Sequence, residues 1–317
     1  MSTIADSHIA THSASNVGIK KVKNDTLGSK GRRLGYVLVA PAIILLLLIT
    51  AFPLGYNIWN SFHHVNFANP IPGQPFSGIH NFKTLTTTPD FGIAFVNTIV
   101  FSAVSVTIEM IIGLGLALVL DKEFKGRGIV RAAVLIPWAV PTVVSAMLWK
   151  TMFDPYTGFV NYLLKILHLP GSNTTWLAHP STAWVAILVA DAWKNTPFIA
   201  ILLLAGLQVI PRDIYEAAKV DGASSWQAFR RLTIPLLKPA ILVALIFRTL
   251  SAFLIFDIIY IMTGGGPGNS TETLAYLNWR AFLVDTNFGY GGAISVALIL
   301  MALVIAGIYV KVLKPET

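Results

Sequence analysis

Residues 34–59 read LGYVLVAPAIILLLLITAFPLGYNIW, a run that contains no charged side chain. A helix of ~20 residues crosses the ~30 Å hydrocarbon core of a bilayer, so this run is long enough to span it. No water is present at that depth to satisfy backbone N–H and C=O groups, and a run of this length must therefore be helical. The stretch predicts a first transmembrane helix over residues 34–61.

The rest of the chain repeats this pattern. Of its 317 residues, 55% are hydrophobic and only 12% are charged, which is far from the average composition of a soluble domain. Five further apolar runs are long enough to cross a bilayer: Ile93–Leu120, Ala132–Trp149, Ala183–Val209, Ala240–Met262 and Ala293–Val312. The sequence predicts an all-α membrane protein with six transmembrane helices, because a barrel would need short alternating strands.

The basic residues are distributed unevenly between the two sides of these spans. Most of the 23 Lys and Arg residues lie in the N-terminal tail, in the second-to-third and fourth-to-fifth connections, and at the C-terminus. By the positive-inside rule both termini are cytoplasmic, and residues 1–33, rich in Ser, Thr, Asn and Lys, are expected to form a flexible cytoplasmic tail. The same rule accounts for the net charge of +8, so nucleic-acid binding is not expected. The absence of cysteine excludes disulfides and thiolate metal sites, and no metal site is predicted.

A polar, charged connection between two spans reads EAAKVDGASSWQAFRRLTIPLLKPA and covers residues 216–240. Two residue pairs near it have capping-box spacing: Asp213 with Glu216, and Ser224 with Gln227. They predict two short helices separated at Gly222, with Pro235 and Pro239 ending the second helix and redirecting the chain into the fifth span. Spacing alone favours equally a docking surface for another protein and a solvated loop that binds nothing.

The loop resembles the cytoplasmic EAA loop of permease subunits of binding-protein-dependent ABC importers. The resemblance rests on these residues: Glu216-Ala217-Ala218, Asp221-Gly222-Ala223, Phe229, Pro235 and Pro239. In that family the loop is a coupling helix that docks into a cleft of the ATPase subunit. The resemblance implies a type I ABC importer permease fold over residues 92–313, with residues 211–240 as the coupling loop. By position, Glu216 would face basic groups of the ATPase, and Asp221 would belong to the same ATPase-coupling set. Gly222 would allow the sharp turn. The small residues would pack in the cleft of the ATPase: Ala217, Ala218 and Ala223.

Other segments are similar to the carbohydrate branch of these permeases, notably LIPWAVPTVVSAMLW at 135–149 and TGGGPGNSTET at 263–273. VSVTIE at 104–109 and FRTLSAFLIFDIIY at 247–260 are similar to trehalose and maltose permeases. The resemblance implies a multi-pass subunit of the bacterial cytoplasmic (inner) membrane that forms half of the pathway for a di- or oligosaccharide. The partners it implies are a second homologous permease, an ATPase dimer, an extracytoplasmic sugar-binding (lipo)protein and membrane lipid.

The sequence contains no G-x-x-x-x-G-K-S/T phosphate loop. ATP and Mg are therefore expected on the partner ATPase, and this chain is expected to be a permease rather than an enzyme, with no cofactor and no catalytic residues of its own. An ion-coupled secondary transporter and a membrane enzyme or scaffold are the alternatives. A secondary transporter would favour an internal repeat, and the six runs show no clear one.

Apart from Lys311 at the end of the last run, the predicted spans contain five charged residues: Glu109, Asp191, Lys194, Arg248 and Asp257. Each costs about 3 kcal/mol at mid-bilayer unless it is paired or wet, so they are expected to face the interior of the bundle. Asp191 and Lys194 are three positions apart and are predicted to form a local ion pair on one helix face. Arg248 and Asp257 are nine positions apart and are expected at different depths.

The fifth span carries the candidate sugar pathway. Phe253, Phe256, Asp257 and Tyr260 recur at spacings of three and four, which places them in one stripe on a continuous helix. Aromatic faces can stack on a sugar ring, and polar groups such as those of Asp257 and Arg248 can bind its hydroxyls. Ordinary helix packing is the alternative explanation of such a stripe.

Prolines within the spans are expected to break the regular ladder of backbone hydrogen bonds. Pro137 and Pro141 lie in the third span, and Pro197 lies beside Asn195 in the fourth. The carbonyl groups that they free are tolerated only against protein or a water-filled cavity. These kinks suit helices that rearrange during transport, although static bundles contain them too.

Overall fold

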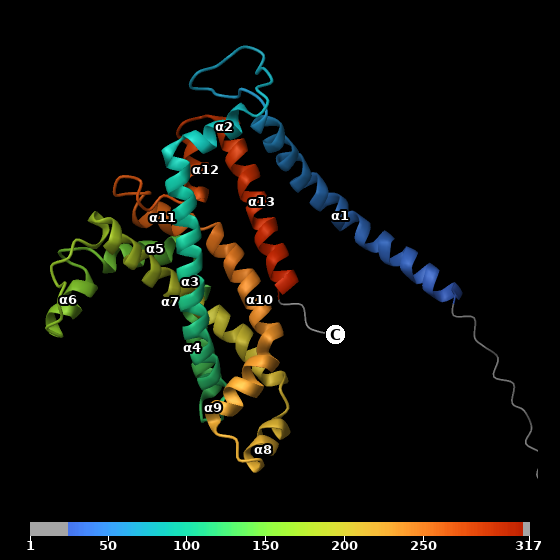
Figure 1. Cartoon of the computed structure of the whole chain (residues 1–317), viewed down its shortest axis with the longest axis vertical. Helices are drawn as coiled ribbons and strands as arrows, with labels where there is room; N and C mark the ends of the chain where they lie inside the picture. Colours follow the sequence, from blue (N-terminus) through green and yellow to red (C-terminus); the bar gives the residue numbers. More distant parts are fainter. Residues whose placement is uncertain (1–24, 313–317) are drawn as a thin grey trace, which may run out of the picture. The chain divides into compact units, whose positions relative to one another are not determined.

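The computed structural model describes residues 25–312, most of which lie in helices (Figure 1). The helices are α1 (Asp25–Ser61), α2 (His80–Thr87), α3 (Pro89–Asp121), α4 (Arg127–Ala139), α5 (Thr142–Met152), α6 (Phe159–Ile166), a 3₁₀ turn (Trp176–Ala178), α7 (Pro180–Val209), α8 (Arg212–Val220), α9 (Ser225–Ala228), a π-helical turn (Phe229–Thr233), α10 (Ile234–Phe253), α11 (Asp257–Met262), α12 (Leu274–Leu283) and α13 (Phe288–Val312). Within the described residues, β pairing is limited to the isolated bridges His63 to Phe76 and Asn66 to Asn287. The predicted all-α class is confirmed.

The chain divides into two compact units, residues 1–54 and 55–317. The described part of the first unit is the N-terminal portion of α1, whose apolar side chains, such as Leu45 and Leu48, are mostly exposed. Leu34–Ser61 within α1 is apolar and long enough to span a bilayer, which matches the predicted first span. Of the predicted flexible tail, residues 25–33 are helical, and residues 1–24 lie outside the described part.

The second unit is a bundle built around α3, α7 and α10. A buried cluster that includes Ile199, Leu203 and Leu237 joins the three helices. The backbones of α7 and α10 approach closely at Gly206. A Cβ atom added to this glycine would lie only 2.4 Å from the Cβ of Ala240. In Figure 1, α8 and α9 lie at one end of this unit, whereas α2 and α12 lie at the other. The loop at 211–240 and the loop at 263–273 therefore occupy opposite ends.

Within residues 25–312, five helices are long and apolar enough to span a membrane, and α4 and α5 together make a sixth span if they are counted as one broken helix. The second, fourth and sixth predicted spans correspond to α3, α7 and α13. The third is broken: α4 and α5 meet at 89°, and Val140 between them is extended. Pro141 directly follows and lacks the N–H that would continue the ladder, so the predicted break is confirmed there. Pro197 lies inside α7, which is assigned as one helix.

The prediction of a continuous fifth span was wrong. The long helix ends at Phe253, and α11 begins at Asp257 after an irregular segment in which Phe256 has φ −134° and ψ −58°. The carbonyl of Ile255 in this break accepts a hydrogen bond of 3.0 Å from the buried hydroxyl of Thr273. A distant side chain therefore satisfies the backbone at the break, and the local sequence does not reveal it.

Pro235 and Pro239 do not end a helix, contrary to expectation. Residues Ser225–Phe253 form one helical segment that passes through both prolines. Pro235 lies in the first turn of α10, and the π-helical turn Phe229–Thr233 directly precedes that helix. Such a turn shifts the hydrogen-bond register just before Pro235, where the missing N–H would otherwise leave a gap.

Candidate functional site

The predicted coupling loop forms two helices joined by a tight turn. At the end of α8 the N–H of Ala223 donates to the carbonyl of Ala218 (2.9 Å), and the N–H of Gly222 donates to that of Lys219 (3.1 Å). This is a Schellman motif, and Gly222 takes its left-handed position with φ +78°. Ser224 and Gln227 then form a reciprocal capping box that starts α9. Gly222 as terminator and the second capping box are confirmed.

The first predicted capping box, Asp213 with Glu216, does not form. α8 begins at Arg212 after Pro211, which makes no side-chain cap. Asp213 therefore lies inside the first turn, where the positive end of the helix dipole stabilises its carboxylate. An exposed ion pair of 2.7 Å joins Arg212 to Glu123 in the connection between α3 and α4, and the hydrogen bond from Arg212 lowers the pKa of Glu123.

The loop presents an open surface with apolar side chains beside it. Glu216, Ala217, Asp221 and Gly222 are exposed, whereas Ala218 and Ala223 are half-buried. A hollow of about 350 Å³ opens at the turn; its lining is Ala218, Asp221, Gly222, Ala223, Gln227, Ala228, Arg231 and Leu232. Val220 is 87% and Trp226 is 67% exposed in the same segment. Large apolar side chains exposed on a polar loop are typical of a surface that another protein covers.

The loop is also attached to the membrane bundle. The hydroxyl groups of Tyr215 on α8 and Thr233 are 3.1 Å apart and form a hydrogen bond, and Thr233 is buried. Thr233 belongs to the helical segment that continues into α10. Sequence reasoning missed this anchor because Tyr215 and Thr233 are 18 positions apart, and no local spacing rule links them.

Three charged side chains meet in the interior of the bundle. Arg248 of α10 donates through Nε and Nη2 to the carboxylate of Glu109 on α3, and through Nη2 to Asp191 on α7. All three are nearly inaccessible to solvent. Asn195 adds a hydrogen bond of 2.8 Å to Asp191. The cluster thus ties together the three central helices, and removing one member would leave a buried charge uncompensated.

The predicted ion pair between Asp191 and Lys194 does not form. Asp191 pairs with Arg248 instead, whereas the Nζ of Lys194 donates to the carbonyl of Val140 at 2.6 Å and approaches that of Trp138 at 3.4 Å. Both cations therefore bind groups on other helices. Arg248 was predicted to lie on the sugar pathway, but its guanidinium group is buried in the charge cluster.

The predicted aromatic stripe is divided by the break after Phe253. Phe253 is fully buried among Leu274, Leu277 and Ile294. The residues beyond the break belong to an aromatic cluster on α11 and α12: Phe256, Tyr260, Tyr276 and Trp279.

Within this cluster the rings of Tyr260 and Trp279 are closest, with centroids 4.9 Å apart. Tyr260 is 44% exposed, and Asp257 beside it is exposed as well. The aromatic cluster therefore offers ring faces next to the exposed carboxylate of Asp257. Trp279 and Tyr276 were not predicted, because they come from α12, outside the fifth span.

Comparison with known protein families matches residues 109–315 to the binding-protein-dependent transport system inner membrane component. This covers more than half of the chain. The chain belongs to that permease family. The match includes the predicted coupling loop, the buried charge cluster and the aromatic cluster, and it confirms the resemblance to this permease family.

Individual relatives are similar over most of their length. The trehalose/maltose transport system permease protein MalF of Thermococcus litoralis is 44% identical over 281 residues, covering 88% of this chain and 93% of the relative. The trehalose transport system permease protein SugA of Mycobacterium tuberculosis is 42% identical over 280 residues, covering 88% of each chain. All are permease subunits, which are transport components rather than enzymes.

Solved structures agree with this assignment. A chain from the crystal structure of a bacterial ABC transporter that imports the acidic polysaccharide alginate matches with a TM-score of 0.78 and 26% identity, covering 92% of this permease and 99% of that chain. A chain of the alginate transporter in complex with a pentasaccharide-bound periplasmic protein matches with a TM-score of 0.76. The permease therefore has the fold of an ABC importer permease.

The loop at 263–273 is fixed to the opposite end of the permease by polar contacts. Asn97 donates to the carbonyls of Ser270 and Glu272, and the indole of Trp184 donates to that of Ser270. Arg280 pairs with Asp90, Glu272 and Asp285. Burial raises the pKa of Glu272 to about 7, although the positive charge of Arg280 opposes this shift.

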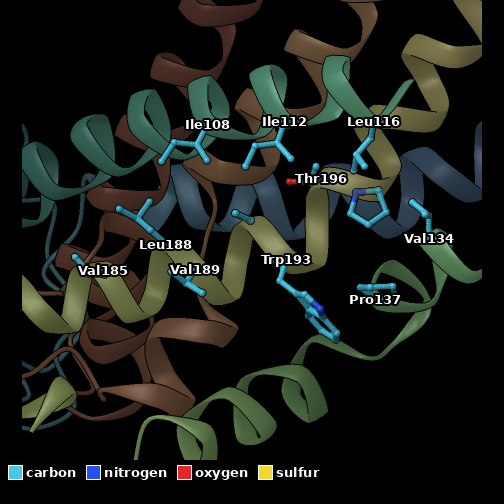
Figure 2. A pocket seen from close by; sticks show the side chains of 12 residues that line it. Ile108, Ile112, Leu116, Val134, Pro137, Val185, Leu188, Val189, Trp193 and Thr196 are labelled. Carbon is cyan, nitrogen blue, oxygen red and sulfur yellow. The ribbon is translucent and has the colours of Figure 1, made fainter. Parts of the chain in front are cut away.

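An apolar groove of about 660 Å³ lies between α3, α4 and α7. Figure 2 shows its lining: Ile108, Ile112, Leu116, Val134, Pro137, Val185, Leu188, Val189, Ala192, Trp193, Thr196 and Pro197. A sugar needs several hydrogen-bonding groups, and this lining offers almost none. The aromatic cluster, with its adjacent carboxylate, matches a carbohydrate better than this groove does.

Proposed function

We propose that this permease forms half of the translocation pathway of an ATP-driven importer of a di- or oligosaccharide such as trehalose or maltose. The observation that carries the proposal is the 44% identity, over nearly the whole length, to a trehalose/maltose permease. The 42% identity to a trehalose permease supports the same class of substrate. In this proposal the second half of the pathway is a homologous permease subunit.

The energy for transport is proposed to come from an ATPase dimer that docks on the coupling loop. The Schellman turn at Gly222 fixes the orientation of α8 relative to α9, and the exposed Glu216 and Asp221 can face basic groups of the ATPase. Exposed Val220 and Trp226 supply apolar area for the same contact. ATP and Mg would be held by the ATPase, because the chain carries no phosphate-binding loop.

The loop would then face the cytoplasm, and both termini with it. The loop at 263–273, which lies at the other end of the bundle, would face the extracytoplasmic sugar-binding protein that delivers the solute (Figure 1). A bacterial inner membrane is the proposed location, and membrane lipid would cover the exposed apolar helices.

For the sugar pathway we propose Asp257 and Tyr260, with the ring of Phe256. Asp257 and Tyr260 are exposed, so a solute can reach both. The carboxylate can accept hydrogen bonds from sugar hydroxyls, and the tyrosine ring can stack on an apolar sugar face. Phe253 and Arg248 are buried and are expected to act through packing and charge pairing instead.

The experiment that tests the proposal is reconstitution of the full complex in proteoliposomes. The chain is combined with its second permease and ATPase, and sugar-loaded binding protein is added. We expect stimulated ATP hydrolysis and uptake of labelled trehalose or maltose. Persistence of both activities at full rate after residues 216–223 are scrambled would contradict the proposal.

A matched pair of charge reversals sharpens this test. Glu216→Lys changes an exposed acid on the coupling loop, whereas Lys165→Glu changes an exposed base on α6, away from it. Only the first is expected to reduce co-purification of the ATPase and coupled uptake. An equal loss in both variants would point to a general effect of surface charge.

A further inference from the structure

The break in the third span creates a local problem in hydrogen bonding. The last carbonyls of α4 have no partners within their own helix, and Pro141 cannot donate to them. At membrane depth no water is available, so an unsatisfied carbonyl is costly. A partner from another element is therefore required where α4 and α5 meet at 89°.

Lys194 of α7 supplies that partner. Its ammonium group donates to the carbonyl of Val140, the residue that ends α4, at 2.6 Å and lies 3.4 Å from the carbonyl of Trp138. The side chain is 9% exposed. A cation at a helix C-terminus is also favoured by the helix dipole. One turn along α7, Phe198 stacks on Trp138 with ring centroids 5.4 Å apart.

Both sides of the break contact α7, but only α5 also contacts α11 through a hydrogen bond among the described residues. α4 contacts α7 through Lys194 and Phe198. α5 contacts α11, where Lys150 donates to the carbonyl of Ile261 at 2.9 Å. It also contacts α7, where the rings of Trp149 and Trp193 have centroids 5.8 Å apart. The angle between α4 and α5 therefore depends on the relative positions of α7 and α11. Lys194 lies at the joint itself.

Lys194 is also one turn from the buried charge cluster. The formal charges of Glu109, Asp191, Arg248 and Lys194 sum to zero when all four are ionised. Two roles for Lys194 are therefore possible. It can balance the charge of the cluster, or it can fix the junction of α4 and α5 by binding the carbonyls at the end of α4. Its short contact is with the Val140 carbonyl, and its ammonium makes no ion pair within 4 Å among the described residues. This geometry favours the second role.

We propose that Lys194 is a positioning residue that fixes the angle of the broken third span by capping the C-terminal carbonyls of α4, so that movement of α7 is transmitted to that span. The proposal deepens the proposed transport function and rests on it for its consequence in uptake. The geometric part is independent of transport and can be measured separately.

The test uses spin labels in the full complex, because the native chain contains no cysteine. Ile129→Cys on α4 and Leu148→Cys on α5 are exposed positions on either side of the break. At a rise of 1.5 Å per residue the labelled backbones lie about 20 Å apart for a right angle and about 28 Å apart for a straight helix. Pulsed electron spin resonance can resolve this difference.

We expect Lys194→Met to shift or broaden the label distance towards the longer value and to lower uptake about tenfold, which is the effect of losing one buried charged hydrogen bond. Lys194→Arg should retain much of the native label distance and of the native uptake, since the arginine guanidinium can reach the same carbonyls. Lys165→Met, at an exposed lysine on α6, is the control and should change neither.

A charge-balanced variant separates the two possible roles and covers the case in which Lys194→Met does not fold. Asp191→Asn with Lys194→Met removes one charge of each sign and leaves the pair of Glu109 and Arg248. If Lys194 positions the break, this variant still shows the altered distance. A native distance in this variant, or in Lys194→Met itself, overturns the proposal. Absence of uptake by the unmodified complex would instead refute the proposed function.

Discussion

The turn at Gly222 gives a prediction whose magnitude follows from the backbone alone. Its φ of +78° lies in the left-handed region, and a Cβ atom added there would meet nothing within 4 Å. Gly222→Ala therefore introduces no clash, and its cost is the conformational strain of about 1–2 kcal/mol for a residue with a side chain. Gly222→Asn should cost less, because asparagine tolerates this region better.

The conformational strain in Gly222→Ala should lower the affinity of the ATPase for the permease. The turn is exposed, so without the ATPase it can relax to another conformation, and the native turn must be restored when the two proteins bind. A cost of 1–2 kcal/mol corresponds to a factor of about 5–30 in an equilibrium constant. We expect the affinity of the ATPase for Gly222→Ala to fall within that range, with Gly222→Asn between it and the native protein.

Titration of the ATPase onto permease in nanodiscs measures this affinity directly. The matched control is Gly115→Ala, which makes the same chemical change inside α3, where an added Cβ also meets nothing within 4 Å but φ is not positive. The control should leave docking unchanged, because alanine is favoured in a helix. Native affinity in Gly222→Ala, or equal affinity in the alanine and asparagine variants, would refute the role of the left-handed turn.

Three further predictions concern the interior, the pathway and the loop opposite the coupling loop. Arg248→Met should destabilise the folded permease by about 3–5 kcal/mol, because it leaves Glu109 and Asp191 unpaired; thermal unfolding should show that replacing both acids by amides as well recovers much of this loss. Tyr260→Ala should reduce sugar uptake while assembly and basal ATP hydrolysis remain, and unchanged uptake would remove Tyr260 from the pathway. Because burial raises the pKa of Glu272 from 4.5 to about 7, the folded state binds the proton more tightly than the unfolded state, so this group's stabilising contribution should be lost as pH rises from about 4.5 to 7. Glu272→Gln should lack this pH-dependent contribution to stability. Parallel pH profiles of the melting temperature in the native protein and in Glu272→Gln would contradict the raised pKa of Glu272.

The sequence was sufficient for the class of protein and for most of the spans, since long uncharged runs allow few alternatives to membrane helices. It also predicted the end of the first loop helix at Gly222 and the second capping box, which depend on residues close in sequence. The break in the third span followed from Pro141. These features share one property: the interactions that determine them are local.

The features that the sequence did not reveal depend on distant residues. Arg248 is 139 positions from Glu109 and 57 from Asp191, so helical spacing favoured the nearer Lys194 as the partner of Asp191. The break after Phe253 is stabilised by Thr273, 18 positions from the carbonyl that it binds. Without knowledge of which helices pack together, a continuous fifth span was the simpler interpretation.

The long helical segment Ser225–Phe253 links the proposed coupling loop to the buried charges. Arg248 lies 23 residues beyond Ser225, a distance of about 35 Å along the axis. A tilt of about 5° would displace one end relative to the other by about 3 Å, which is enough to break the contacts of Arg248. Because breaking them costs about 3–5 kcal/mol, we expect α3, α7 and α10 to move as one body when the loop is displaced. We then expect the rearrangement at the break near Leu254, where the backbone is already irregular, rather than between the three central helices.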